Sequence, residues 1–261
     1  MGAETRPSYL DPAARPGLFD GMLAIWRGAG FLAGHPRLLP FALIPVLINV
    51  VLFALFFYMS LSYFSHWLDS LIPQSETWYW IALIYLLTII VIVLLLLIIA
   101  FTFTILANII ASPFNDALSA KTEVLASGVD TGAPFSLVGI IKETGRTIIE
   151  ELKKLLFYGV VVGLLFLLNL IPVLGQTLWG ILFMLFTVIW LGLSFLDYAL
   201  ARHGFRFRAK LGFVRRNLFP VLGYGAGVFA GLLIPVFNLA IIPIAVVGGT
   251  LLYLELRDDY E

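Results

Sequence analysis

The residues in this chain that could bind a small anion are neutral and polar, and they follow two breaks in apolar sequence. Gly175, Gln176 and Thr177 follow one Ile-Pro-Val sequence, and Asn238 follows another. Each break is expected to begin a helix, where backbone N–H groups lack partners and the helix dipole favours negative charge. Such donors suit an oxyanion, which is costly to dehydrate. We predict that these four residues line an anion path; in the alternative, Thr177 and Asn238 only cap their helices.

Arg37 is the permanent charge beside the first apolar stretch, and it is predicted to be a basic ligand for the anion. Catalytic chemistry has little support. The chain has no cysteine and its three histidines are isolated, so neither thiol catalysis nor a metal cluster is expected. Asp197 and Arg202 are expected to cap a helix end rather than to act as acid and base. The glycines of Gly223-Tyr-Gly-Ala-Gly227 are expected to pack helices, not to bind phosphate. We therefore expect no enzyme activity and no cofactor.

Long uncharged stretches must position these residues. Hydrophobic residues make up 61% of the 261-residue chain and charged residues only 12%, about half the charged fraction of a soluble domain. The stretches without charge are 38–65, 77–115, 155–196 and 217–254. Since about 20 apolar helical residues cross the hydrocarbon core, each stretch is long enough to span a bilayer. The sequence therefore predicts an all-α integral membrane protein.

The first two stretches are predicted to be full transmembrane helices, 38–64 and 78–112. The connection between them, residues 66–76, contains acids but no Lys or Arg, whereas the other connections carry several. Basic residues favour the cytoplasmic side, so 66–76 is placed outside and the termini are placed in the cytoplasm.

The last two stretches are predicted to be helical hairpins, 155–196 and 217–254, that bend at Pro172 and Pro235. The bends are mostly apolar, and the arms before them are short for a full span. We therefore favour hairpins that penetrate only half of the membrane, with their tips buried in protein or lining a watery cavity. In the alternative, both hairpins cross completely and the chain has six spans.

Residues 18–34 are predicted to form an amphipathic helix in the membrane interface. Phe19, Met22, Leu23 and Trp26 share one side of this helix at helical spacing. The alternative is an ordinary helix packed on the cytoplasmic part of the protein.

Residues 115–156 are predicted to form a cytoplasmic helical extension. Pro113 is expected to end the second crossing helix, with Asn108 and Asn115 capping the freed backbone groups. The basic segment 197–216 is predicted to anchor the protein to anionic lipid; in the alternative, it forms an electropositive mouth for an anion.

Several motifs, in this order, resemble the CysZ family of bacterial sulfate permeases. They are Asn108-Ile-Ile-Ala-Ser-Pro-Phe-Asn115, Ile171-Pro-Val-Leu-Gly-Gln-Thr177, Asp197-Tyr198 and Ile234-Pro-Val-Phe-Asn-Leu-Ala-Ile-Ile-Pro243. The resemblance covers approximately residues 18–257. It implies two full crossings, two half-penetrating hairpins and antiparallel homo-oligomers in the inner membrane. It also implies import of sulfate for cysteine biosynthesis.

The chain departs from the family's pattern before the first crossing. The resemblance implies a sulfate site with Gly, Leu and two Arg, but the arginine positions fall on Leu39 and Pro40, and only Arg37 offers charge there.

We expect a permease for sulfate or a similar oxyanion, working passively or coupled to an ion, because the chain has no ATP-binding motif. The alternative is a non-transporting membrane protein that organises or shapes lipid. With 16 basic and 16 acidic residues, the chain has no net field to attract nucleic acid.

Overall fold

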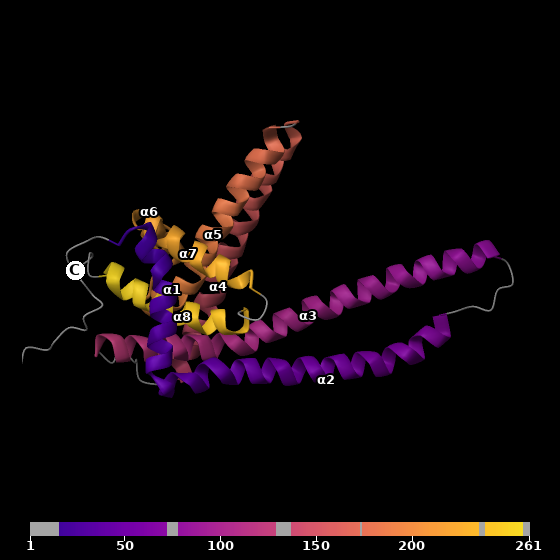
Figure 1. Cartoon of the computed structure of the whole chain (residues 1–261), viewed down its shortest axis with the longest axis horizontal. Helices are drawn as coiled ribbons and strands as arrows, with labels where there is room; N and C mark the ends of the chain where they lie inside the picture. Colours follow the sequence, from indigo (N-terminus) through magenta and orange to yellow (C-terminus); the bar gives the residue numbers. More distant parts are fainter. Residues whose placement is uncertain (1–15, 72–77, 129–136, 173, 235–237, 258–261) are drawn as a thin grey trace, which may run out of the picture. The chain divides into compact units, whose positions relative to one another are not determined.

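The computed structural model describes residues 16–71, 78–128, 137–172, 174–234 and 238–257, and all regular secondary structure within them is helical (Figure 1). The α-helices are α1 (Leu18–Gly34), α2 (Leu39–Leu71), α3 (Trp78–Ser127), α4 (Leu137–Phe166), α5 (Leu174–Arg202), α6 (Phe207–Arg216), α7 (Leu218–Leu232) and α8 (Asn238–Arg257). Two short 3₁₀ helices, η1 (Pro36–Leu38) and η2 (Leu167–Leu170), follow α1 and α4. The expected all-α class is confirmed for these residues.

Four helical segments in the described residues are long and apolar enough to cross a membrane. They are Pro36–Tyr58, Tyr79–Phe103, Leu174–Arg202 and Ala240–Arg257. The protein is therefore a membrane protein with several candidate spans. The chain divides into a smaller compact unit, Pro40–Phe114, and a larger one that contains the described residues up to Leu39 and from Asn115 onward.

The smaller unit is a pair of helices whose side chains face outward. In this unit α2 and α3 lie side by side (Figure 1) and touch through Phe53 and Phe103, whose rings meet edge to face with centroids 5.5 Å apart. Val51, Leu97 and Phe101 are 65%, 61% and 70% exposed. Such a surface would be strongly unfavourable in water and is stable in hydrocarbon.

Glycines allow four helices of the larger unit to pack backbone against backbone. Gly223 of α7 lies on the carbonyl oxygen of Leu18 in α1, and Gly225 of α7 lies on that of Val188 in α5. A Cβ atom at these glycines would lie only 1.8 Å and 1.9 Å from those oxygens. Gly28 of α1 approaches the backbone of α8 in the same way. Close contact through small residues is how helices associate in lipid, and the small-residue packing predicted for residues 223–227 is confirmed at both glycines.

Helix α1 has the bounds that the sequence predicted, and it has two different faces. Its glycine-containing face packs on α7 and α8. The opposite face exposes Phe19, Met22, Leu23 and Trp26, which are the residues of the predicted apolar stripe. An exposed apolar stripe fits an interfacial helix, and the membrane placement stays a prediction.

The prediction that Pro113 ends the second crossing helix is wrong, because α3 continues through Pro113 to Ser127. Proline removes one backbone hydrogen bond and strains the preceding turn, yet helices of membrane proteins tolerate it. From Asn115 onward α3 belongs to the larger unit and has a buried face within it, and the packing of this face offsets the lost hydrogen bond. Pro243 is likewise buried inside α8.

The two helical hairpins are present in the described residues, but their arms differ in length. In Figure 1, α4 and α5 run side by side as far as η2. The 15 residues of α7 make an arm of about 22 Å, as short as predicted. Helix α4 is longer than the predicted arm, with 30 residues, because it begins in the polar sequence before Lys154. How deeply the hairpins enter a membrane stays a prediction.

Gly225→Ala should destabilise the protein by about 1–3 kcal/mol, because the new methyl group overlaps the carbonyl oxygen of Val188 and forces α5 and α7 apart. Gly180→Ala is the matched control, since Gly180 is exposed on α5 and nothing lies within 4 Å of its added Cβ. Thermal unfolding in detergent measures both variants. Equal melting temperatures for the two alanine variants would show that the close approach at Gly225 does not hold these helices together.

Candidate functional site

The end of α3 presents a buried polar face. Asn115, Ser119, Thr122 and Glu123 recur at the spacing of one side of a helix. All four are buried, and Ser119, Thr122 and Glu123 have no exposed surface. In an apolar bundle each of these groups needs a partner.

Glu123 is held by the end of α5. Its Oε2 accepts a hydrogen bond from Arg202 Nη1 at 3.1 Å, and its Oε1 lies 2.6 Å from His203 Nε2. Because an ionised carboxylate only accepts hydrogen bonds, Nε2 is the protonated nitrogen of this imidazole. Arg202 Nη2 also donates to the carbonyl oxygen and to Oδ1 of Asp116, both at 2.8 Å. One arginine therefore binds two carboxylates of α3.

A chain of hydrogen bonds continues from this arginine to α8. Arg202 Nη1 lies 3.4 Å from Ser119 Oγ, and Ser119 Oγ lies 2.8 Å from Thr250 Oγ1. The Thr250 hydroxyl donates to the carbonyl oxygen of Val246, so it accepts from Ser119. Nearby, Asn115 Nδ2 donates to the Tyr198 hydroxyl at 3.3 Å. The polar face of α3 is thus bonded to both α5 and α8.

A second buried cluster surrounds Asp197 of α5. Its Oδ2 accepts from Lys154 Nζ of α4 at 2.7 Å, and its Oδ1 pairs with Lys210 of α6. Burial disfavours the ammonium of Lys154, but the charge and hydrogen bond of Asp197 outweigh this effect, so the pKa of Lys154 lies above its ordinary value. Lys154 is therefore protonated at every physiological pH. Asp197 lies inside α5, and Arg202 is the last residue of this helix. Both side chains bind partners on other helices, and the predicted capping role stays a prediction.

Glu150 of α4 anchors the start of α6. Its carboxylate accepts from Lys153 Nζ at 2.7 Å and from the backbone N–H of Phe207 at 2.8 Å. The hydrogen bond from Lys153 and then that from Phe207 lower the pKa of Glu150. Together with the pair formed by Lys210 and Asp197, this contact holds α6 against both α4 and α5.

Comparison with known proteins assigns the family. The family model described as sulfate transporter CysZ/etoposide-induced protein 2.4 matches residues 24–243. The chain is 34% identical over 258 residues to a protein of Pseudomonas paraeruginosa named sulfate transporter CysZ, covering 98% of this chain and 96% of the relative. It belongs to this family.

Other relatives with the same name agree. One from Pseudomonas fluorescens strain Pf-5 is 40% identical over 226 residues, covering 85% of this chain and 88% of the relative. One from Vibrio cholerae is 33% identical over 223 residues, with 85% and 88% covered. The resemblance to the CysZ family that the motifs indicated is confirmed.

The structure places the residues predicted to bind sulfate in this CysZ-family chain at separate positions. Arg37 is exposed in η1. Gln176 and Thr177 are exposed in the first turn of α5, at the tip of the hairpin of α4 and α5, which Figure 1 shows far from the end of α1. Gly175 is buried in the same turn, where an added Cβ would lie 1.9 Å from the carbonyl oxygen of Leu168. Its close approach is therefore to the chain's own backbone.

The remaining motif residues have mixed positions. Asn115 contacts Tyr198, which brings two of the motifs that carry the CysZ resemblance together. Pro172 is exposed in the turn between η2 and α5, and Pro113 is exposed on α3. Asn238 is the first residue of α8. The side chains of Asn108 and Asn238, and all of Pro235, lie outside the described residues.

The sequence analysis missed Ser119, Thr122, Glu123 and Thr250. The signal was present for the first three, because their spacing together with Asn115 marks one side of a helix. Polar residues are also expected in a solvated extension, so their presence in this segment does not by itself indicate a buried face. The sequence alone gave no indication that Thr250 would oppose Ser119.

Asp197→Asn should lower the free energy of unfolding by about 3–5 kcal/mol, because two buried ammonium groups lose their shared counter-charge. Asp116→Asn is the matched control: its side chain is 62% exposed, and an exposed pair contributes about 1 kcal/mol at most. Denaturation in detergent measures both variants. A similar small loss for both would show that Asp197 is not a buried counter-charge.

Proposed function

We propose that this chain is a permease that moves sulfate across the membrane into the cytoplasm, where it supplies cysteine biosynthesis. The observation that carries this proposal is membership of the CysZ family, with 34% identity over 98% of the chain to a relative named sulfate transporter CysZ. We further propose a bacterial inner-membrane location, with the termini in the cytoplasm and the chain assembled as a homo-oligomer.

The hairpin tips provide donors suited to an anion in transit. Gln176 and Thr177 lie in the first turn of α5, and Asn238 begins α8. The positive end of the helix dipole lies at first turns. In α5 the N–H groups of Leu174 and Gly175 already donate to the carbonyl oxygens of Pro172 and Ile171, so the donors offered to an anion there are mainly the side chains of Gln176 and Thr177. Neutral donors bind an anion without holding it so tightly that it cannot leave. This arrangement supports a path along the hairpin tips.

Arg37 can supply charge to the anion, because its guanidinium is exposed in η1, next to the start of α2, and a guanidinium offers paired donors to an oxyanion. Arg202 at the end of α5 is already bound to the carboxylates of Asp116 and Glu123, so it has no unmatched charge for sulfate.

In liposomes, the reconstituted chain should take up labelled sulfate faster than empty liposomes do. Arg37→Ala should weaken sulfate binding by about 1.5–3 kcal/mol, the value of a charged hydrogen bond. The matched control Arg208→Ala, at an exposed arginine of α6, should not weaken it. Gln176→Ala and Asn238→Ala should slow uptake without lowering the melting temperature.

The outcomes separate the alternatives. If Gln176 and Asn238 only cap helices, their alanine variants should lose about 0.5–2 kcal/mol of stability and keep normal uptake. Normal uptake in both variants contradicts a path along the hairpin tips, and unchanged binding by Arg37→Ala removes Arg37 from the site. A folded wild-type protein with no uptake above empty liposomes contradicts the permease itself and favours a lipid-organising membrane protein.

A further inference from the structure

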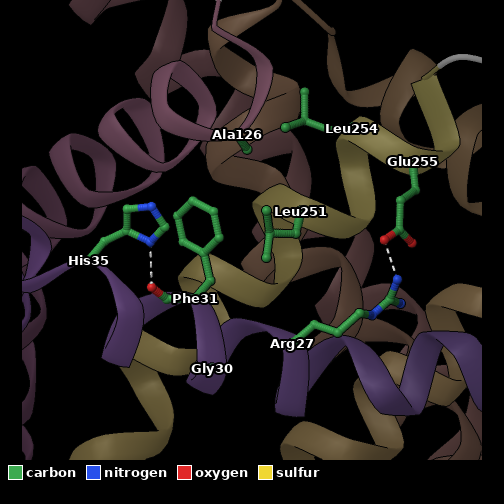
Figure 2. A pocket seen from close by; sticks show the side chains of 8 residues that line it. All are labelled: Arg27, Gly30, Phe31, His35, Ala126, Leu251, Leu254 and Glu255. Carbon is green, nitrogen blue, oxygen red and sulfur yellow. Dashed lines mark hydrogen bonds and ion pairs between the residues drawn. The ribbon is translucent and has the colours of Figure 1, made fainter. Parts of the chain in front are cut away.

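A cavity of about 310 Å³ lies between α1, α8 and the end of α3 (Figure 2). Its walls are mainly apolar and are formed by Phe31, Ala126, Leu251 and Leu254. These four residues are each no more than 8% exposed, so lipid on the outer surface of the protein does not reach them. The volume is at the lower end of the range for ligand cavities, about 300–1,000 Å³.

The polar groups of the cavity carry no net charge. Figure 2 shows Arg27 joined to Glu255 on one side of the cavity and His35 beside Phe31 on the other. His35 Nδ1 donates to the carbonyl oxygen of Phe31 at 2.8 Å, and the two rings stack with centroids 4.1 Å apart. Because Glu255 already matches the charge of Arg27, a second anion gains little there. The part of a ligand that fits best inside this cavity is therefore apolar and uncharged.

The mouth of the cavity faces the apolar surface of α1. Gly30 lines the cavity, is exposed, and has no atom within 4 Å of its added Cβ. It shares one side of α1 with the exposed Phe19, Leu23 and Trp26. An apolar chain lying along this stripe can thus enter beside Gly30 without crossing a polar surface.

We propose that this cavity holds one acyl chain of a membrane phospholipid. The lipid is bound between α1 and α8 and is distinct from the lipid that surrounds the protein. Since the lining is neutral, zwitterionic and anionic phospholipids bind equally well.

The test is photo-crosslinking of the full chain in vesicles of phosphatidylethanolamine that carries a diazirine on one acyl chain. Peptide mapping should find adducts on Leu251 or Leu254 in addition to adducts on the exposed stripe of α1. Replacing phosphatidylethanolamine by phosphatidylglycerol should give the same yield on these leucines. Adducts confined to the exposed stripe of α1 would overturn the proposal. Labelling of Leu251 and Leu254 by phosphatidylglycerol alone would overturn the claim that zwitterionic and anionic phospholipids bind equally well.

A matched pair of variants tests the entry route. Gly30→Trp places an indole at the mouth and should reduce the adducts on Leu251 and Leu254 about tenfold. Gly180→Trp makes the same change at an exposed glycine of α5 that also has open space around it, and it should leave the yield unchanged. Equal yields in both variants would contradict entry beside Gly30. Should Gly30→Trp fail to fold, as judged by its melting curve, the wild-type mapping decides the proposal by itself.

Discussion

The carboxylate of Glu123 imposes the strictest requirement on this structure, because it has no exposed surface in a bundle of apolar helices. An ionised group buried in this way is stable only when counter-charges and hydrogen bonds surround it. Arg202 and His203 supply these contacts from the end of α5. Arg202 also binds Asp116 and Ser119 of α3. The end of α3 is thereby fastened to α5 by charged groups and not only by apolar packing.

This arrangement requires α1, α5, α7 and α8 to lie close together, and glycines allow the short distances between their backbones. Gly223 and Gly225 bring α7 against both α1 and α5, and Gly28 brings α1 against α8. With the helices fixed in this way, Thr250 of α8 lies where it can accept a hydrogen bond from Ser119. Lipid supplies no hydrophobic drive between helices, so small-residue contacts and buried polar contacts must both contribute to stability.

The sequence predicted the helical class, the bounds of α1 and the glycine packing, since all follow from local spacing of apolar, charged and small residues. It failed at Pro113, because the gain from packing the helix beyond Pro113 depends on partners distant in sequence. The partners of Asp197 could not be predicted for the same reason: Lys154 and Lys210 are on other helices, and nothing local identifies them. The contacts of Gly175 and Glu123 likewise depend on the tertiary structure. Gly175 approaches the backbone of Leu168, and Glu123 binds side chains at the end of α5.

The central claim is that the pair formed by Glu123 and Arg202 couples α3 to α5, and a double-mutant cycle tests it most directly. The cycle compares the unfolding free energies, in detergent, of Glu123→Gln, Arg202→Met and the double variant with that of the wild type. Each single variant leaves a buried group without its partner, so each should lose about 3–5 kcal/mol. The double variant should be more stable than the sum of the single losses implies, by about 2 kcal/mol. Losses that add within about 0.5 kcal/mol would contradict the account.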